Sequence, residues 1–257
     1  MIPKIIHQLG PADKNRWHPV WLRCYGSWQE QHSRDYTIKL WSDEEADDLV
    51  KTSYSEYFDI YKAFTFNICR IDFVRFCILH KFGGLYADLD YYCYSNFFNE
   101  LTESCYVVGS SYNHEIVQNS LMAAEPNQEF FIECMEASKR AFLSNEFSYT
   151  PNNVFSQESN NYVMDITGPR LLSRLITTTK CKVFIMPSMV YNPPLTEYNK
   201  SIRAKHMMTG SWSSDVIDQK MRDHKLSNEF ATYQDYMQED YLGFRKIDLK
   251  TFKFKPE

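Results

Sequence analysis

The sequence predicts an α/β fold in which a largely parallel central sheet is flanked by helices. Short apolar runs of strand length alternate with longer segments of helical periodicity, the order that parallel strands joined by crossover helices require. The 257 residues, 44% of them hydrophobic, suffice to bury a sizeable core. No linker divides the chain, so we expect a single domain over residues 1–257 with a more irregular C-terminal third.

The first elements are expected to be two strands, each followed by a helix. Residues 4–9 and 37–41 are short apolar runs that predict strands. Pro19 opens a helix over 19–31, because proline suits the first helical position and apolar residues recur on one stripe. Ser42, followed by three acidic residues, is typical of the N-cap and first turn of another helix.

The middle of the chain carries the clearest helix and the strand that follows it. Residues 55–82 predict one or two helices, and apolar residues recur at helical spacing over 67–82. Gly83 and Gly84 end this helix as a C-terminal glycine cap does. We then expect strands over 85–92 and 105–109.

Later segments predict two more helices and a last strand. Residues 127–144 have an amphipathic helical pattern, and Pro169 opens a further helix. Residues 182–186 predict a strand that ends at Pro187. The polar stretch 144–161 is expected to be a long surface loop, with a lid as one role for it.

Composition and charge exclude several classes of protein. The chain has 28 Lys and Arg against 33 Asp and Glu, so a dedicated nucleic-acid binder is not expected. No apolar run approaches the roughly 18 residues of a membrane-spanning helix, and the start of the chain lacks the pattern of a signal peptide. Seven scattered cysteines without a Cys-x-x-Cys pair argue for reduced thiols. These features predict a cytoplasmic protein.

The strongest chemical signal is the pair Asp88 and Asp90, near the end of the predicted strand 85–92. Residues i and i+2 of a strand point to the same side, so the two carboxylates are expected to project together. Two adjacent carboxylates repel each other unless a cation lies beside them. Mg²⁺ and Mn²⁺ prefer oxygen ligands and bridge to substrate phosphates, so the pair predicts a metal–diphosphate site. Taken alone, the motif is weak, because most occurrences of Asp-x-Asp are solvated acidic turns.

The preceding helix places charged residues in an otherwise apolar pattern. Arg70, Asp72 and Arg75 interrupt the apolar residues over 67–82. An ion pair on the helix surface is one explanation for Asp72 and Arg75, which are three residues apart. Charges on such an apolar helix need partners, however, and this favours a polar pocket.

Five short blocks of the chain, in order from residue 2 to residue 212, match one known family. They are Ile2-Pro3-Lys4-Ile5-Ile6-His7-Gln8, then Asp72-x-x-Arg75 with Gly83-Gly84-x-Tyr86-x-Asp88-x-Asp90, then Asn119 to Pro126, then Thr167-Gly168-Pro169, and finally His206 with Gly210-Ser211-Trp212. On these blocks the chain resembles glycosyltransferase family 32. That family comprises Asp-x-Asp sugar transferases such as the yeast outer-chain α-1,6-mannosyltransferases and bacterial capsule enzymes, with the clostridial glucosylating toxins as distant relatives.

The resemblance implies a GT-A fold, a Rossmann-like α/β sandwich that binds a nucleotide-sugar and a divalent cation, Mn²⁺ or Mg²⁺. It implies a nucleotide-sugar-binding half over 1–126 and an acceptor and site-closing half over 127–257. It also implies that Asp88, Asp90 and His206 hold the metal, while Asp72, Arg75 and Asp90 carry catalysis. The other expected contacts to the nucleotide-sugar are His7, Gln8, Arg70, Tyr86, Ser211 and Trp212, with Asn119, Thr167 and Gly168 on the donor or acceptor side.

The implied activity is transfer of a hexose, with retained anomeric configuration, from the nucleotide-sugar to a glycan, glycolipid or protein. We expect front-face attack, because the sequence offers no secure enzyme nucleophile. Family members often continue His-Gln with Thr-Trp or a similar aromatic, whereas this chain has Leu9-Gly10-Pro11. That departure leaves the choice of base open, and a UDP-sugar is favoured over GDP-mannose.

Simpler interpretations of some residues stay open. On sequence alone, His7 is more typical of a hydrogen-bonded core histidine. His206 is also compatible with an ordinary loop residue, and Trp212 with a core side chain. Gly168 is explained equally well as the turn before a helix that Pro169 opens.

Two other function classes remain as alternatives for the whole chain. A haloacid-dehalogenase-like phosphatase also places Asp-x-Asp after a strand, although Tyr91-Tyr92 follows the motif here. A non-catalytic nucleotide-sugar-binding module is the second alternative.

Residues 244–257 combine Lys and Arg with Phe, which predicts either a solvated tail or peripheral contact with the inner membrane face.

Overall fold

The computed structural model describes residues 1–111, 115–144 and 157–208 and confirms the α/β fold. The strands are β1 Ile5–Leu9, β2 Thr37–Trp41, β3 Gly84–Ala87, β4 Tyr91–Cys93, β5 Cys105–Gly109, β6 Val117–Ala124, β7 Phe184–Met186 and β8 Ala204–His206. The helices are α1 Pro19–Gln31, α2 Asp43–Ser53, α3 Ser55–Ala63, α4 Asn67–Phe82, α5 Glu129–Leu143, α6 Gln157–Ile166, α7 Pro169–Ile176 and α8 Ser188–Tyr191, with short 3-10 turns η1 Lys14–Arg16 and η2 Phe98–Glu100.

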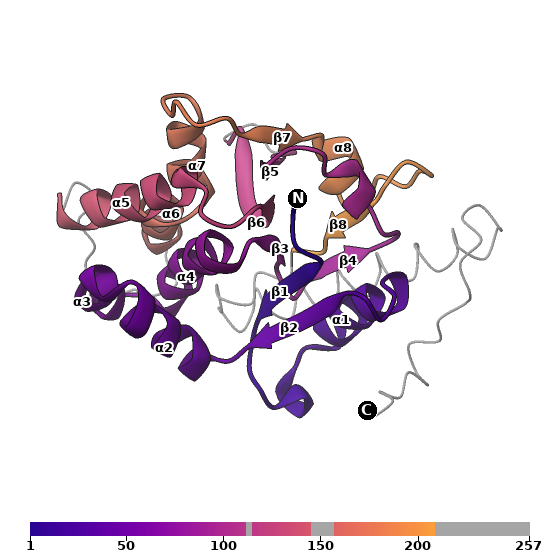
Figure 1. Ribbon diagram of the computed structural model, residues 1–257, viewed down its shortest axis with the longest axis horizontal. Coiled ribbons are helices and arrows are strands. Elements are labelled where there is room, and N and C mark those ends of the chain that lie inside the picture. Colours follow the sequence, from indigo (N-terminus) through magenta and orange to yellow (C-terminus); the bar gives the residue numbers. More distant parts are fainter. Residues whose placement is uncertain (112–114, 145–156, 209–257) are drawn as a thin grey trace.

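Six strands form the central sheet in the order β2-β1-β3-β6-β5-β7, and β4 pairs with β8 beside it (Figure 1). The sheet is mixed: β1 is parallel to β2 and β3, and β5 is parallel to β7, whereas β6 runs antiparallel to both of its neighbours. The carboxyl ends of β1, β2 and β3 therefore share one edge with the amino end of β6. This is the edge at which α/β sheets bind ligands.

Local sequence signals explain why several elements begin and end where they do. Helix α1 carries Pro19 at its first turn, and α2 begins with a full capping box between Ser42 and Glu45. The turn from α4 into β3 requires glycine, because Gly83 and Gly84 have φ of 63° and 88°. A Cβ on Gly84 would lie 2.5 Å from the Ile5 carbonyl oxygen, so this turn is packed directly against β1.

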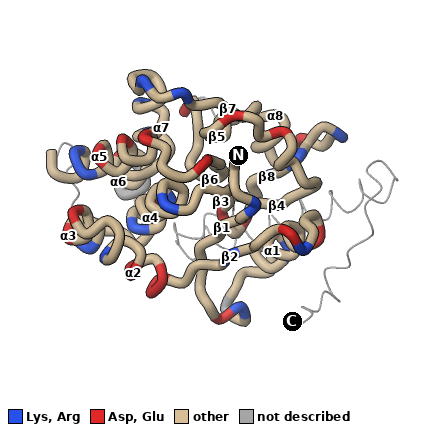
Figure 2. The backbone as a smooth tube through the Cα atoms, in the orientation of Figure 1, with Lys and Arg blue, Asp and Glu red and all other residues tan. Residues whose placement is uncertain are grey.

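The sheet is covered on both faces, and each face has its own buried cluster. On one face, α2 to α7 pack against strand residues such as Tyr86, Val107 and Met122. On the other, Trp28 of α1 and the segment around η2 and α8 pack against Leu85, Ala87 and their neighbours. Lys, Arg, Asp and Glu lie mainly on the surrounding helices and loops, while the central strands are largely without them (Figure 2). Charged residues buried near the sheet edge are therefore exceptions that need a reason.

Two predictions are corrected by the structure. The strand expected over 85–92 ends at Ala87; residues 88–90 form a turn closed by the Tyr91 N–H donating to the Asp88 carbonyl at 3.0 Å, and the chain continues as β4 in a different sheet. The polar loop expected over 144–161 contains the start of α6 at Gln157, and residues 145–156 lie outside the described part. The single domain and its division at residue 126 stay predictions. In the described residues, no helix is long and apolar enough to cross a membrane.

Candidate active site

A cavity of about 300 Å³ opens at the edge where β1 and β3 end. Its polar wall contains most of the charged residues that the sequence singled out, and its other wall is apolar. The described lining consists of Leu9, Gly10, Pro11, Trp21, Ile68, Ile71, Asp72, Arg75, Tyr86, Asp88, Leu89, Asp90, Gln118, Asn119, Ser120, Val163, Met164, Pro169, His206 and Met208.

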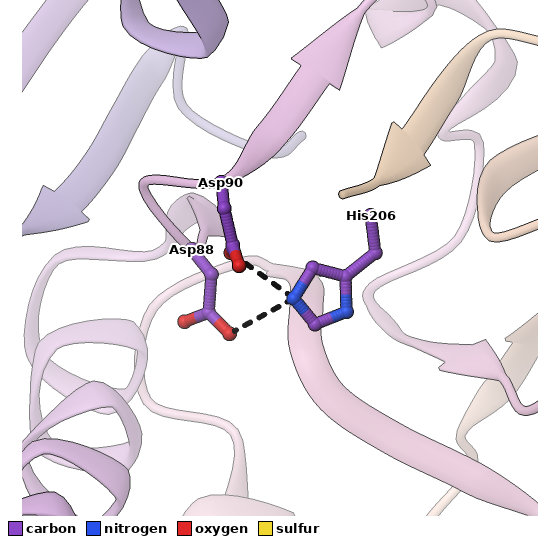
Figure 3. Close-up of side chains that lie close together, drawn as sticks. All are labelled: Asp88, Asp90 and His206. Atoms are coloured by element: carbon purple, nitrogen blue, oxygen red, sulfur yellow. Dashed lines mark hydrogen bonds and ion pairs between the residues drawn. The ribbon is translucent and has the colours of Figure 1, made fainter. Parts of the chain in front are cut away.

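Asp88, Asp90 and His206 converge on one point of this cavity (Figure 3). One ligand atom from each residue lies within 4.8 Å of the others. His206 Nε2 is 3.0 Å from Asp90 Oδ1 and 4.0 Å from Asp88 Oδ2. Two carboxylate oxygens and one imidazole nitrogen facing one another are a donor set that suits Mn²⁺ or Mg²⁺, so these residues could hold the predicted cation.

Backbone contacts hold the two segments of this cluster together. The Met207 N–H donates to the Asp90 carbonyl at 2.8 Å, and the pairing of β4 with β8 sets Tyr91 opposite His206. From the other side, Gln8 Nε2 donates to the Asp88 carbonyl at 3.3 Å. The turn that carries both aspartates is thus fixed by β1 and by β8.

The electrostatics of the cluster favour a positive partner. Burial raises the pKa of Asp88, and the neighbouring Asp90 raises it further against the opposing effect of Arg75. Burial lowers the pKa of His206, but the carboxylates of Asp90 and Asp88 outweigh it and the net shift is upward. A bound divalent cation would offset the repulsion between the two carboxylates and would take the place of the proton that they favour on His206.

A second charged group, Asp72 and Arg75 of α4, lies beside the first. Arg75 Nη2 is 2.9 Å from Asp72 Oδ1 and 3.3 Å from Asp88 Oδ1, so the guanidinium joins the two groups. Asp72 also accepts hydrogen bonds from Asn119 Nδ2 at 3.0 Å and Thr167 Oγ1 at 3.1 Å. The sequence predicted a polar pocket for these charges instead of a surface pair, and both side chains are buried.

Arg75 is fixed in the cavity wall by contacts from several directions. Its Nη1 donates to the Asn119 carbonyl at 2.9 Å, and its guanidinium lies 4.9 Å from the centre of the Tyr86 ring. Its Nε is buried with no hydrogen-bond partner among the described residues. Although burial opposes the charged form, Asp88 and the other nearby acidic groups raise the pKa of Arg75. For the carboxyl of Asp72, burial instead raises the pKa, to about 6, and Arg75 acts against that shift.

Three of the predicted nucleotide-sugar residues do not line this cavity. His7 is buried in the core, where its Nδ1 accepts from the Trp41 indole at 3.1 Å and its Nε2 lies 3.0 Å from the Gly83 carbonyl oxygen. Burial lowers the pKa of His7 to about 4, so the ring is neutral. Gln8 supports the Asp88 backbone, and Arg70 lines a neighbouring cavity of about 210 Å³ instead. The structure thus favours the core interpretation of His7.

The remaining predicted residues fall into three groups. Tyr86 lines the cavity and donates its hydroxyl to Asp88 Oδ1 at 2.8 Å. Thr167 donates its hydroxyl to Asp72 and does not line the cavity. Gly168 is the N-cap residue of α7. Ser211 and Trp212 lie outside the described residues, as does the basic and aromatic segment 244–257.

Two polar residues of the cavity wall were not singled out in the sequence. Gln118 and Ser120 lie on either side of Asn119 at the start of β6, and all three are buried. The Ser120 carbonyl accepts from the Asp88 N–H at 2.9 Å, which fixes this strand to the turn. Three consecutive polar residues in an otherwise apolar run, Val117 to Ala124, are the signal that could have revealed them.

Comparison with known families agrees with this geometry. Residues 19–108 match the family described as the glycosyltransferase sugar-binding region containing a DXD motif. Asp88-Leu89-Asp90 is that motif in this chain. Residues 19–108 thus belong to the DXD-motif glycosyltransferase family. The matched region contains Asp72, Arg75 and both aspartates of the motif, whereas His206 lies beyond it.

Several curated proteins are similar to this chain in sequence. Inositol phosphoceramide mannosyltransferase 3 of Schizosaccharomyces pombe is 30% identical over 172 residues, which cover 67% of this chain and 44% of that protein. A mannosyl phosphorylinositol ceramide synthase of Saccharomyces cerevisiae is 31% identical over 139 residues, which cover 54% of this chain and 36% of that protein. The chain thus spans less than half the length of either relative.

One solved structure extends the comparison to the fold. The PaToxG glycosyltransferase superposes with a TM-score of 0.50 at 14% identity, over 68% of this chain and 69% of that chain. At this identity the likeness concerns the fold alone. The fold of this DXD-family chain is accordingly of the GT-A type that the sequence predicted.

Proposed function

We propose that the chain is a metal-dependent glycosyltransferase that moves a mannose from a sugar nucleotide to an inositol-phosphate glycolipid. The observation that carries the proposal is the convergence of Asp88, Asp90 and His206 on one point of a cavity that Arg75 also lines. A hard cation and a diphosphate fit side by side there, because the acidic cluster attracts the cation and the guanidinium attracts the phosphates.

The residues of the cavity have separate roles in this proposal. Asp88, Asp90 and His206 would hold the cation, which when bound supplies Lewis-acid stabilisation of the departing diphosphate. Arg75, preorganised by Asp72 and the Asn119 carbonyl, would donate to the same developing charge without having to reorganise. The buried polar groups of Gln118 and Ser120 lie where hydroxyls of the transferred sugar would need partners.

The donor is where the proposal departs from the expectation drawn from the sequence. The sequence favoured a UDP-sugar, but the two relatives described above are named as mannosylating enzymes. That naming favours GDP-mannose as the donor. His7, expected near the base, lies in the core, so it supports neither base.

Retention of configuration is part of the proposal. Among the described residues, Asp72, Asp88 and Asp90 are the carboxylates that line the cavity. Asp72 already accepts from Arg75, Asn119 and Thr167, and the other two face His206. Since none is presented as a separate nucleophile, front-face attack by the acceptor is favoured over a covalent glycosyl-enzyme.

The acceptor assignment rests on the relatives' names and on one feature of the cavity. Both names refer to inositol-containing ceramide lipids. In this chain, Ile68 and Ile71 of α4 face the cavity together with Val163 and Met164 of α6. An apolar wall beside a diphosphate site suits an acceptor that has an apolar part, and it ranks glycan and protein acceptors behind a glycolipid.

A donor-turnover screen tests the proposal. GDP-mannose and a panel of UDP-sugars are incubated with the protein and Mn²⁺, Mg²⁺ or EDTA, with and without an inositol phosphoceramide, and the released nucleotide is measured. We expect release of GDP that needs the metal, rises with the acceptor and yields a mannosylated lipid of retained configuration by NMR. Release of UDP instead would correct the donor, and an inverted product would remove the front-face mechanism.

Two further measurements separate the alternatives. Phosphate release from simple phosphate esters would support a phosphatase, although Asp88 Oδ1, as the expected nucleophile, already accepts from Tyr86 and Arg75. Metal-dependent binding of a sugar nucleotide without any turnover would support a non-catalytic module. When a carboxylate of the motif is removed, as in Asp90→Asn, the matched control is Asp35→Asn, at an exposed acid paired with Lys4.

A further inference from the structure

Tyr91, the residue directly after the DXD motif, lies against the imidazole of His206. The two rings are stacked, with centroids 5.2 Å apart and only 10° between their planes. The Tyr91 side chain is fully buried, and its hydroxyl donates to the Tyr191 carbonyl at 2.6 Å. The Tyr91 carbonyl in turn accepts from the Trp28 indole at 2.7 Å. The phenol ring is therefore fixed from both ends.

His206 lacks the support that a metal-binding histidine commonly has. Such a histidine usually donates its second ring N–H to a carboxylate or carbonyl, which fixes the ring's orientation. Here Nε2 faces Asp90, while Nδ1 is buried and finds no hydrogen-bond partner within the described residues. The orientation of this imidazole must then come from packing against its flat face.

The strand pairing explains why Tyr91 is in position to supply that packing. Tyr91 and His206 are directly opposite each other in the antiparallel pair β4 and β8, so their side chains lie on the same face. The next pair, Tyr92 and Lys205, lies on the other face by the alternation of strands. Tyr91 thus connects the DXD turn to His206, which lies 116 positions after Asp90 in the chain.

We propose that Tyr91 is a positioning residue for the metal site: its ring holds the His206 imidazole so that Nε2 points at Asp88 and Asp90. This inference rests on the proposed function, because it presupposes that the three residues bind a cation. Tyr91 itself does not line the cavity, and it acts only through His206.

The test is direct titration of the full-length protein with Mn²⁺ alone, by calorimetry or by the EPR signal of free Mn²⁺. Tyr91→Leu removes the aromatic face and is expected to weaken Mn²⁺ binding about tenfold. Tyr91→Phe keeps the stacked ring and is expected to bind Mn²⁺ within about threefold of the wild type. Tyr92→Leu, an equally buried tyrosine on the opposite face, is the matched control and is expected to bind as the wild type does.

A double-mutant cycle separates positioning from general support of the fold. If Tyr91 acts through the imidazole, Tyr91→Leu causes no further loss of Mn²⁺ affinity in a His206→Ala background. If Tyr91 only supports the turn, the loss persists without His206, because Asp90 would shift as well. The second result overturns the proposal.

The remaining outcomes are also decisive. Wild type that binds Mn²⁺ no better than His206→Ala overturns the metal site and this inference together. Wild type that binds well, with Tyr91→Leu unaffected, overturns the inference alone.

Should Tyr91→Leu fail to fold, proton NMR of the wild type replaces the titration. The ring protons of His206, identified by their loss in His206→Ala, are expected upfield because of the stacked phenol. Ordinary shifts contradict the stack.

Discussion

Two acidic groups face the same cavity, and they are balanced in opposite ways. Asp72 lies on α4 with a guanidinium and two further donors on its carboxylate, so its charge is compensated by the protein. Asp88 and Asp90 lie on a turn and face His206, and Asp88 also contacts Arg75 and the Tyr86 hydroxyl. The first group thus has one carboxylate beside one guanidinium, whereas the second has two carboxylates beside one histidine.

This difference separates scaffold from binding site. Two neighbouring buried carboxylates favour a cation beside them, because burying like charges together is costly. In the proposed function, Arg75 instead serves a separate, anionic partner. The proposal thus gives the cavity one position for a cation and one for an anion, the arrangement that a metal–diphosphate requires.

The largest effect is expected from the turn that carries Asp88 and Asp90. Asp90→Asn removes a proposed ligand and should lower turnover of the sugar nucleotide by roughly 10³-fold, because the charge on the leaving diphosphate loses its main stabilisation. Steady-state release of GDP with saturating Mn²⁺ measures it. Asp35→Asn serves as the control, and equal activity of both variants would contradict the proposed roles.

Asp72 and Arg75 are expected to respond through stability as well as through turnover. Arg75→Met leaves Asp72 buried without its cation and should reduce the free energy of unfolding by about 3–5 kcal/mol. Adding Asp72→Asn to that variant should recover part of the loss. Urea denaturation measures both, with Arg70→Met on the same helix, whose side chain is partly exposed, expected to cost less than about 1 kcal/mol. An equal loss of unfolding free energy in Arg75→Met and Arg70→Met would contradict the structural role given to Arg75.

Metal affinity at Asp88, Asp90 and His206 is expected to depend on pH. The pKa values of His206 and Asp88 are raised, so a proton must leave before the cation binds, and Mn²⁺ affinity should increase as pH rises from 6 to 8. One displaced proton gives at most about a tenfold gain per pH unit. Calorimetry in two buffers of different ionisation enthalpy counts the protons, and affinity that is flat over this range sinks the prediction.

The smallest effect is expected in the scaffold behind both groups. Trp41→Phe removes the indole N–H that donates to His7 and should reduce the free energy of unfolding by about 1 kcal/mol. Mn²⁺ affinity should be unchanged, because neither residue lines the cavity. A loss of metal binding in this variant would place His7 in the site after all.

Residues with strong local signals allowed much of the fold to be predicted. Pro19, Ser42 and Gly83 mark helix ends by their own backbone chemistry: α1 begins at Pro19, α2 begins after Ser42, and α4 ends before Gly83. Asp88 and Asp90 were expected to project from one strand, whereas they converge through a turn. The apolar residues on both sides of the motif gave no local sign that the strand breaks there.

Long-range pairing is what the sequence could not provide. The β4–β8 pair joins Tyr91 to His206, and no periodicity in either short segment predicts the other. The antiparallel insertion of β6, which brings Gln118 and Ser120 to the cavity, is likewise a property of the whole sheet. Resemblance to a family anticipated His206, but the means by which its ring is held became visible only in three dimensions.

The most direct test of the cation site is an anomalous difference map from crystals grown with Mn²⁺ and GDP, recorded at the manganese edge. The account predicts one strong peak within coordination distance of Asp88, Asp90 and His206 Nε2, with the diphosphate density beside Arg75. A map without a peak there, in crystals where His206 still hydrogen-bonds Asp90, would contradict it.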